Sequence, residues 1–300
     1  MRSAVFRSSL AGLVALGLGL ASAGSASAAE TAEPAGPPLS AAPTPAPRRA
    51  SPPASAEAEA RTYERCMAMA KTDPAAAKDL AESWKDRGGA HPAEHCAAIA
   101  LFEQKQYKPA ATRLEALAQA MEHAPVSLRA DVLEQAAQAW LLAGDPVRAY
   151  ATDGAALTLR PGDPDLLVDR AEAAGAAGFF DKAVADLDRV LKANPDRVDA
   201  LIYRASANRA LNRLDPAMAD IDKALALEPD SVAGLLERGN LRSLRGDRDG
   251  ARHDWAQVGV LAPGSAADTA AKRNIERMEL NEAQTAPAVH PAPAGKPAGR

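Results

Sequence analysis

The chain has 300 residues, of which 47% are hydrophobic and only 4% aromatic, and its formal net charge at pH 7 is −4. Proteins that bind nucleic acid usually carry a basic face, so this acidic balance argues against a nucleic-acid partner.

Residues 1–28 have the layout of a secretory signal peptide. Arg2 and Arg7 precede an apolar run over residues 10–20, and small residues follow up to an A-x-A site that ends at Ala28. Cleavage there removes two positive charges and no negative one, which takes the net charge from −4 to −6. A membrane-spanning helix needs about 20 apolar residues, and no stretch of the chain reaches that length. We expect an exported chain without a transmembrane segment, periplasmic if the source is Gram-negative; the alternative is an N-terminal helix retained as an anchor.

Two Ala- and Pro-rich stretches, residues 29–55 and 285–300, show no apolar periodicity. Neither can bury enough apolar surface to offset the entropy lost on ordering, so we predict a disordered linker and a disordered tail. A plain linker is favoured over a Pro-rich ligand for a recognition domain. The remaining stretch of about 230 residues is large for one compact core but ordinary for a solenoid.

A helical pattern begins weakly in residues 56–125. Tyr63 and Met67 share one predicted helix, Asp73-Pro74 ends it, and Trp84 lies on the next. A second weak helix pair spans residues 91–124, where we place His91 in a turn because it precedes Pro92.

From residue 130 the pattern repeats every 34 residues. One column holds large apolar residues, two hold small residues and one holds prolines. The columns are Leu133, Leu167, Leu201 and Leu235; Ala137, Ala171, Ala205 and Gly239; Ala149, Ala183, Ala217 and Ala251; and Pro161, Pro195, Pro229 and Pro263. Small residues let the two helices of a hairpin approach closely. Asp145-Pro146 and Asp215-Pro216 are predicted N-caps with proline in the first turn, and Ser265 is predicted to cap a final helix.

These columns resemble the tetratricopeptide repeat, a helix-turn-helix unit. The resemblance implies an all-α, right-handed α-solenoid of about five to six repeats over residues 56–284. It covers residues 130–263 clearly and residues 56–125 weakly, and a capping helix follows at 265–284. The sequence departs from the family pattern in its few aromatic residues, and in an arginine where the second bulky residue of the first helix is expected.

Charged residues also keep the interval. Arg170, Arg204 and Arg238 each precede an aspartate by sixteen residues: Asp186, Asp220 and Asp254. We expect ion pairs that fasten one helix to another, because both signs recur together. A charged stripe for a ligand is the alternative.

Cys66 and Cys96 are the only cysteines, and they fall on the first helices of consecutive predicted pairs. An exported chain meets an oxidising compartment, so a disulfide is the leading interpretation, with free buried thiols or a metal site as alternatives. The metal or enzymatic alternative would use His91, His95 and Cys96. The sequence contains no G-x-S-x-G, H-E-x-x-H, P-loop or paired CxxC motif, so we expect no catalytic residues, metal or cofactor.

The resemblance also implies where a partner binds. In this fold, the position one residue after the small-residue column lines the concave groove. The predicted groove consists of a polar ladder, Gln138, Glu172, Ser206 and Asn240, flanked by Glu134, Val168, Ile202 and Leu236 and by Arg209 and Ser243. Polar groups beside apolar ones suit an extended peptide. We therefore expect a non-catalytic scaffold that binds a protein or peptide partner in the cell envelope; an ordinary solvated helix face is the alternative for these positions.

Overall fold

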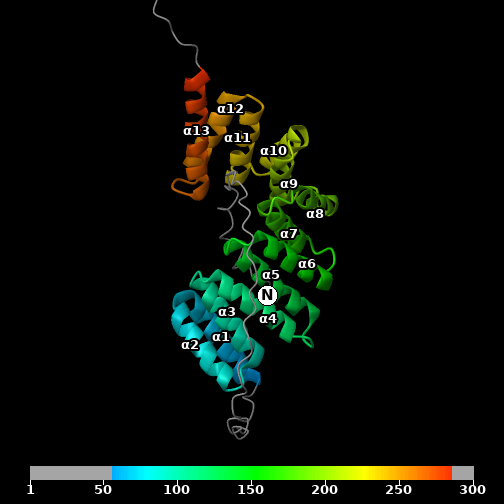
Figure 1. The fold of residues 1–300 in the computed structure, drawn as a ribbon, viewed down its shortest axis with the longest axis vertical. Coiled ribbons are helices and arrows are strands. Elements are labelled where there is room, and N and C mark those ends of the chain that lie inside the picture. The colour runs from blue at the N-terminus through cyan, green and yellow to red at the C-terminus, as the bar shows by residue number, and fades with distance from the viewer. Residues whose placement is uncertain (1–55, 286–300) are drawn as a thin grey trace, which may run out of the picture. The chain divides into compact units, whose positions relative to one another are not determined.

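The computed structural model describes residues 56–285, which form thirteen α-helices and no strand (Figure 1). The all-α prediction is confirmed. The predicted signal peptide at 1–28, the linker at 29–55 and the tail from residue 286 onward lie outside the described residues. Thr285, which we assigned to the tail, is the last residue of the final helix. The described part divides after Pro161 into two compact units, residues 56–161 and residues 162–285.

The N-terminal unit, residues 56–161, consists of three helix pairs in which each helix packs on the next along the chain. The pairs are α1 (Ala56–Thr72) with α2 (Pro74–Asp86), α3 (Ala90–Glu103) with α4 (Tyr107–Ala120), and α5 (Val126–Leu142) with α6 (Pro146–Leu159). Its interior is rich in alanine, and Leu114 and Trp140 are among its large buried side chains. The weak pattern over residues 56–125 therefore does fold as two helix pairs.

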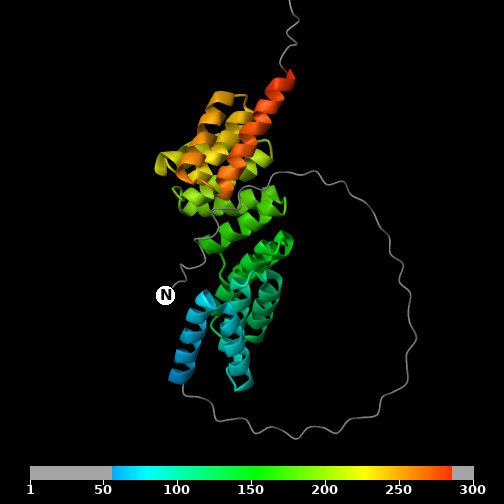
Figure 2. The ribbon, with the colours of Figure 1, turned by 90° about the vertical axis from the view of Figure 1, so that its left-hand side faces the viewer.

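The C-terminal unit, residues 162–285, holds three further pairs and a last helix. They are α7 (Pro164–Ala176) with α8 (Phe180–Ala193), α9 (Val198–Ala210) with α10 (Leu214–Leu227), α11 (Val232–Leu244) with α12 (Arg248–Leu261), and α13 (Ala266–Thr285). The first helices of successive pairs contact each other, α7 with α9 and α9 with α11. The last helix packs along α11 and α12, as Figure 2 shows, and Ser265 Oγ caps it by accepting from Asp268 N at 3.1 Å. The predicted final helix is confirmed.

Side-chain caps begin α2, α6, α7, α11, α12 and α13, whereas α3, α4, α5, α8, α9 and α10 begin without one. Asp73 and Asp145 each accept a backbone N–H three residues later at 3.0 Å, and a proline follows each of them. The prediction for Asp215 was wrong: α10 begins at Leu214 with Arg213 at its N-cap, so Asp215 lies inside the first turn. A carboxylate in that turn still interacts favourably with the positive end of the helix dipole.

His91 also lies elsewhere than predicted. Helix α3 begins at Ala90, so His91 and Pro92 occupy its first turn instead of a loop. Proline is tolerated there because the first backbone N–H groups of a helix have no acceptor within it.

The small-residue column sits where the two helices of a pair cross. Ala171 and Ala205 are buried, and Gly239 replaces alanine in the third pair of the C-terminal unit. A Cβ at Gly239 would lie 2.4 Å from Nε1 of Trp255, whose position in the repeat is held by Leu187 and Ile221 in the other two pairs. Glycine therefore makes room for the indole ring opposite it.

Cys66 of α1 and Cys96 of α3 form a disulfide with a Cα–Cα distance of 6.1 Å. Both residues are fully buried beside Ala81 and Ala97. The predicted bond between the first helices of consecutive pairs is confirmed.

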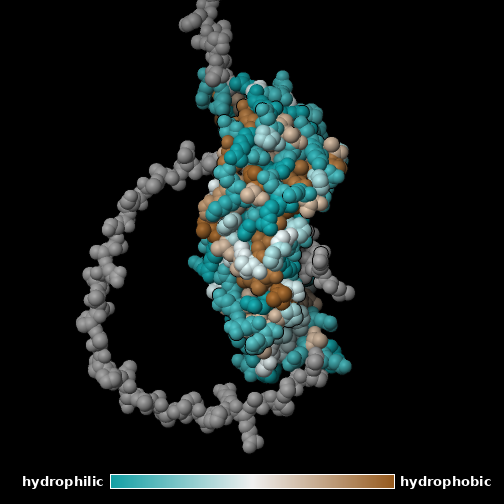
Figure 3. Space-filling model, turned by 90° about the vertical axis from the view of Figure 1, so that its right-hand side faces the viewer, coloured by the Kyte–Doolittle hydropathy of each residue, from teal (hydrophilic) through white to brown (hydrophobic). Residues whose placement is uncertain are grey.

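Within residues 56–285, no helix is both long and apolar enough to cross a bilayer. Large exposed hydrophobic side chains are scattered over several helices, and the face in Figure 3 shows apolar atoms in separate patches among hydrophilic ones. Scattered single side chains of this kind are normal on a protein surface.

Candidate functional site

A pocket of about 680 Å³ opens on the C-terminal unit where the first helices α7 and α9 lie side by side. We call it the acidic pocket. Its lining comes from α7, from the α8–α9 connection with the first turns of α9, and from the α10–α11 connection with the start of α11. The lining residues are Val168, Asp169, Glu172, Asn194, Asp196, Arg197, Val198, Asp199, Ile202, Tyr203, Glu228, Ser231 and Ala233.

The apolar part of the lining includes two buried side chains. Val168 and Ile202 are only 4% and 5% exposed, because their side chains also belong to the packed contact between α7 and α9. The apolar floor of the pocket therefore belongs to the packed interior of the repeats, and the polar groups around it determine what chemistry fits.

Arg197 is the one basic residue of the lining, and it is held by two aspartates. It lies 3.0 Å from Asp165 and donates from Nε and Nη2 to Asp199 at 2.8 and 3.0 Å. Asp165 belongs to α7 and Asp199 to α9, so this arginine fastens two successive repeats. At the rim, Lys223 Nζ lies 3.0 Å from Asp196.

Glu172 and Tyr203 form a hydrogen-bonded pair between α7 and α9, in which the phenol donates to the carboxylate. Burial raises the pKa of Glu172 to about 7, because removal from water disfavours the charged form, and the Tyr203 hydrogen bond offsets this in part. Burial also raises the pKa of Tyr203, as does the negative charge of Glu172. The carboxyl group can therefore change its charge near neutral pH.

The three Arg–Asp pairs predicted from the interval are confirmed. Each arginine on a first helix donates from two nitrogens to both oxygens of the aspartate on the second helix of the same pair, at distances from 2.6 to 2.9 Å. The pairs are Arg170 with Asp186, Arg204 with Asp220 and Arg238 with Asp254. Their groups are engaged within the hairpins, which disfavours the alternative of a ligand stripe.

No family model matches the sequence, and no curated protein matches it. Solved structures do match. The thermophilic TPR protein TTC0263 of Thermus thermophilus is 20% identical over 64% of this chain and 100% of its own, with a TM-score of 0.50. The fold is the tetratricopeptide repeat fold.

Two other solved tetratricopeptide-type chains are similar at lower scores. YrrB, described as a TPR protein with an unusual peptide-binding site, is 18% identical over 60% of this chain and 97% of its own, with a TM-score of 0.49. MamA from Desulfovibrio magneticus RS-1 is 19% identical over 57% of this chain and 94% of its own, also with a TM-score of 0.49. Tetratricopeptide repeats serve in general as scaffolds with extended surfaces for protein partners.

Three of the ten predicted groove residues line the acidic pocket: Val168, Glu172 and Ile202. Ser206 lies half-buried on α9 outside the pocket lining, and Leu236 is 3% exposed within the packing of α11. A direct role for either of these two in binding stays a prediction.

Arg209 and Asn240 belong to a polar network instead of an open ladder. Arg209 Nε donates to Glu237 at 2.5 Å, Asn240 donates to the same carboxylate at 3.3 Å, and Asn274 donates to Asn240 at 2.9 Å. This network joins α9, α11 and α13. Burial raises the pKa of Glu237, while Arg209 acts in the opposite direction.

The two predicted residues of the N-terminal unit lie on α5. Gln138 is half-buried, and Glu134 accepts from Arg160 at 3.0 Å. The carboxylate of Glu134 is thus used within its own unit.

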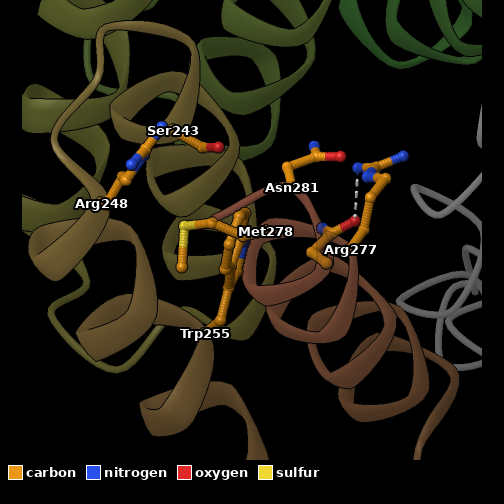
Figure 4. Close-up of a pocket in the computed structure, with 7 residues that line it drawn as sticks. Ser243, Arg248, Trp255, Arg277, Met278 and Asn281 are labelled. Carbon is orange, nitrogen blue, oxygen red and sulfur yellow. Dashed lines mark hydrogen bonds between the residues drawn. The ribbon is translucent and has the colours of Figure 1, made fainter. Parts of the chain in front are cut away.

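Ser243 lines a smaller pocket of about 170 Å³ between α11, α12 and α13. Figure 4 shows Met278 beside Trp255 in this pocket. Arg277 Nη2 donates to Asn274 Oδ1 at 2.9 Å. The pocket has about a quarter of the volume of the acidic pocket.

The histidine-cysteine cluster has no free thiol, because Cys96 is bonded to Cys66. His95 accepts from the Tyr63 hydroxyl at 2.7 Å and donates from Nε2 to Gln135 at 2.6 Å, and burial lowers its pKa. His91 is exposed. In the part of the chain that the structure describes, no group of three or more His, Cys, Asp or Glu residues is placed to hold a metal ion.

Sequence reasoning missed Tyr203, Asp169 and the loop residues that complete the pocket. Tyr203 directly follows the predicted Ile202, and its aromatic ring is unusual in a chain with 4% aromatic residues, so it had a usable signal. Asn194 and Glu228 each directly precede a proline of the repeat, so in the sequence they indicate only the end of a helix. They carry no signal for a site, because their position in the pocket depends on how the repeats stack.

Proposed function

We propose that this chain is a non-catalytic scaffold of the cell envelope, and that an extended segment of a protein partner binds in the acidic pocket. The observation that carries the proposal is the 680 Å³ pocket on the first helices of two successive repeats. Its buried apolar floor can receive side chains, and its polar rim can satisfy a peptide backbone.

Two observations support an envelope location. The signal-peptide layout of residues 1–28 addresses the chain for export. The Cys66–Cys96 bond suits an oxidising compartment. We expect the intact mass of the protein from its native host to correspond to a chain that begins at Ala29. A mass that includes Met1 in the exported form would contradict this.

The metal or enzymatic alternative based on His91, His95 and Cys96 receives less support. The Cys96 sulfur is bonded to Cys66, and both ring nitrogens of His95 are engaged by neighbouring side chains. The scaffolds that share this fold are typically non-catalytic, which favours binding over catalysis here.

The test is site-specific photo-crosslinking in the native host. A photoreactive residue replaces Asp199 at the exposed rim of the pocket, and the control replaces Lys192, which is exposed on α8. We expect Asp199 to capture one defined segment that Lys192 does not capture. A synthetic copy of that segment should bind the purified mature chain. The proposal fails if the two positions capture the same proteins, or if the synthetic segment does not bind.

A further inference from the structure

We propose that the acidic pocket selects a partner segment by a lysine or arginine side chain, whose cation lies against Glu172. This inference rests on the proposed function, since it names the chemistry of the segment that the pocket receives.

The charges of the lining are unbalanced. It contains five carboxylates, from Asp169, Glu172, Asp196, Asp199 and Glu228, against the single guanidinium of Arg197. Arg197 is shared between Asp165 and Asp199, and Lys223 is taken by Asp196. Among residues 56–285, neither Glu172 nor Glu228 has a cationic partner. An incoming cation therefore finds two carboxylates with no cation beside them.

The carboxyl group of Glu172 is largely buried, and charged groups of α7, α8, α9 and the α8–α9 connection lie around it. Asp169 lies one turn earlier on α7, and Tyr203 and Asp199 lie on α9. The negative charges of both aspartates raise the pKa of Tyr203. Arg197 stands in the α8–α9 connection and is bonded to Asp199 and paired with Asp165, and Asp186 of α8 is bonded to Arg170. Glu172 thus shares the pocket with acidic groups and with the phenol of Tyr203, while Arg197, the one guanidinium of the lining, is paired with Asp165 and Asp199. A cationic ligand would stabilise its charged form.

The pocket suits the length and apolar stem of a lysine or arginine side chain as well as its positive charge. Val168 and Ile202 form an apolar floor of the kind on which the methylene stem of lysine or arginine packs while its charged end reaches polar groups. Asn194 and Ser231 are placed in the two connecting loops, where they can bond to a peptide backbone. A volume of about 680 Å³ lies in the ordinary range for ligand sites.

The probe is a fluorescein-labelled octapeptide library in which one central position is fixed in turn as lysine, arginine, acetyl-lysine or glutamate. Binding to the mature chain is measured by fluorescence anisotropy at low salt. We expect the lysine and arginine sets to bind at least about tenfold more tightly than the acetyl-lysine set, since a hydrogen-bonded charge pair is worth that much. Glu172→Gln should reduce the difference to less than about threefold, while the control Glu276→Gln on the exposed face of α13 should keep it.

The pH dependence separates a charge contact from a loss of shape. Between pH 6 and pH 8 the affinity for the lysine set should rise, because Glu172 has a pKa of about 7 and gains its charge in this range. The Gln variant should show a flatter profile. If Glu172→Gln does not fold, the comparison of lysine with acetyl-lysine on the unchanged protein still decides the question.

The outcomes distinguish this inference from the proposed function. Equal binding of the lysine and acetyl-lysine sets, together with specific capture at Asp199, would overturn the charge selection and leave the scaffold in place. Absence of both binding and capture would overturn both the charge selection and the scaffold.

The sequence of residues 286–300 contains Lys296 and Arg300 and no acidic residue. A chain that ends at Thr285 is compared with the chain that ends at Arg300. If the shorter chain binds the lysine set more than about tenfold more tightly than the longer one, the occupant is the chain's own tail, and the inference of a separate partner is overturned.

Discussion

At the scale of single residues, side chains at matching positions of the repeat complement each other across the helix pair. In the C-terminal unit the position opposite the small residue is Leu187, Ile221 or Trp255. Alanine stands opposite the first two and glycine opposite the tryptophan, whose Nε1 donates to the backbone oxygen of Leu236 at 3.3 Å. The repeat therefore conserves the combined volume of a pair rather than the identity of either residue.

Gly239→Ala should destabilise the protein. The added Cβ would meet the Trp255 ring at 2.4 to 3.0 Å, and a packed indole cannot move aside without cost. We expect the free energy of unfolding to fall by about 1–3 kcal/mol, measured by urea denaturation. Combining it with Trp255→Leu, which restores the arrangement of the other pairs, should cost at least about 1 kcal/mol less than the sum of the two single changes. Simple additivity would show that the two positions do not share space as described.

The raised pKa of Glu172 makes stability depend on pH. Its folded-state pKa of about 7 exceeds the ordinary glutamate pKa of 4.5, so the folded state holds a proton that the unfolded chain releases. The resulting stabilisation is fully present below about pH 4.5 and is lost as the pH rises through about 7. The measurement is the unfolding free energy of the protein minus that of the Glu172→Gln variant, followed as a function of pH. This difference should fall by at most about 3 kcal/mol between about pH 4.5 and pH 7 and then stay constant. A difference that does not change with pH would show that Glu172 titrates normally.

At the scale of helices, the Arg–Asp pairs tie the first helix of each pair to the second. Asp186, Asp220 and Asp254 are buried, and Asp254 also accepts from Arg242 at 2.8 Å. Buried ion pairs add less stability than their geometry suggests, because both charges lose water. Removal of one partner nevertheless destabilises the fold strongly, because it leaves a buried charge without a counter-ion. The recurrence of the same pair in three repeats indicates that it sets the register of the hairpin.

Arg204→Ala should lower the melting temperature more than it weakens peptide binding. The change leaves Asp220 buried without its main partner, and it also removes the contact to Asp188 at 2.7 Å. We expect a loss of about 2–4 kcal/mol in the free energy of unfolding. Calorimetry and anisotropy on the same sample measure both effects. If the melting temperature held while binding vanished, the arginine series would have a binding role instead.

At the scale of the whole molecule, the two units are stabilised by different means. The N-terminal unit contains the disulfide between α1 and α3, whereas the C-terminal unit carries the three regular Arg–Asp pairs. The weaker repeat pattern of residues 56–125 coincides with the covalent link. A cross-link compensates for fewer specific contacts by restricting the unfolded chain.

Exported protein should therefore contain no free thiol. Labelling under denaturing, non-reducing conditions should leave both cysteines unmodified, and two labelled cysteines would contradict the bond. The double variant Cys66→Ala/Cys96→Ala should lose up to about 3–4 kcal/mol of stability, since the bond closes a loop with a sequence separation of 30. Unfolding of the N-terminal unit, followed by Trp84 and Trp140 fluorescence, should shift to lower denaturant concentration.

The sequence by itself predicted the helix pairs and the ion-pair partners, and it made the disulfide the leading interpretation of the two cysteines. Large and small residues recur every 34 residues, and this pattern predicts each hairpin. Arg204 and Asp220 belong to the same hairpin, so their spacing in the sequence was sufficient to pair them. The cap error at Asp215 arose because a helix can start two residues earlier without changing its buried face.

Only the tertiary structure decided which polar residues form the site. The ladder Glu172, Ser206 and Asn240 is regular in sequence, yet Glu172 lines the pocket, Ser206 stands outside it and Asn240 is bonded within a network. The periodicity specifies the face of a helix, but Tyr203 and Arg197 come together with Glu172 only when successive repeats stack and their loops fold over the helix ends. Loop paths and charge partners between repeats depend on that stacking, and a one-dimensional pattern does not contain it.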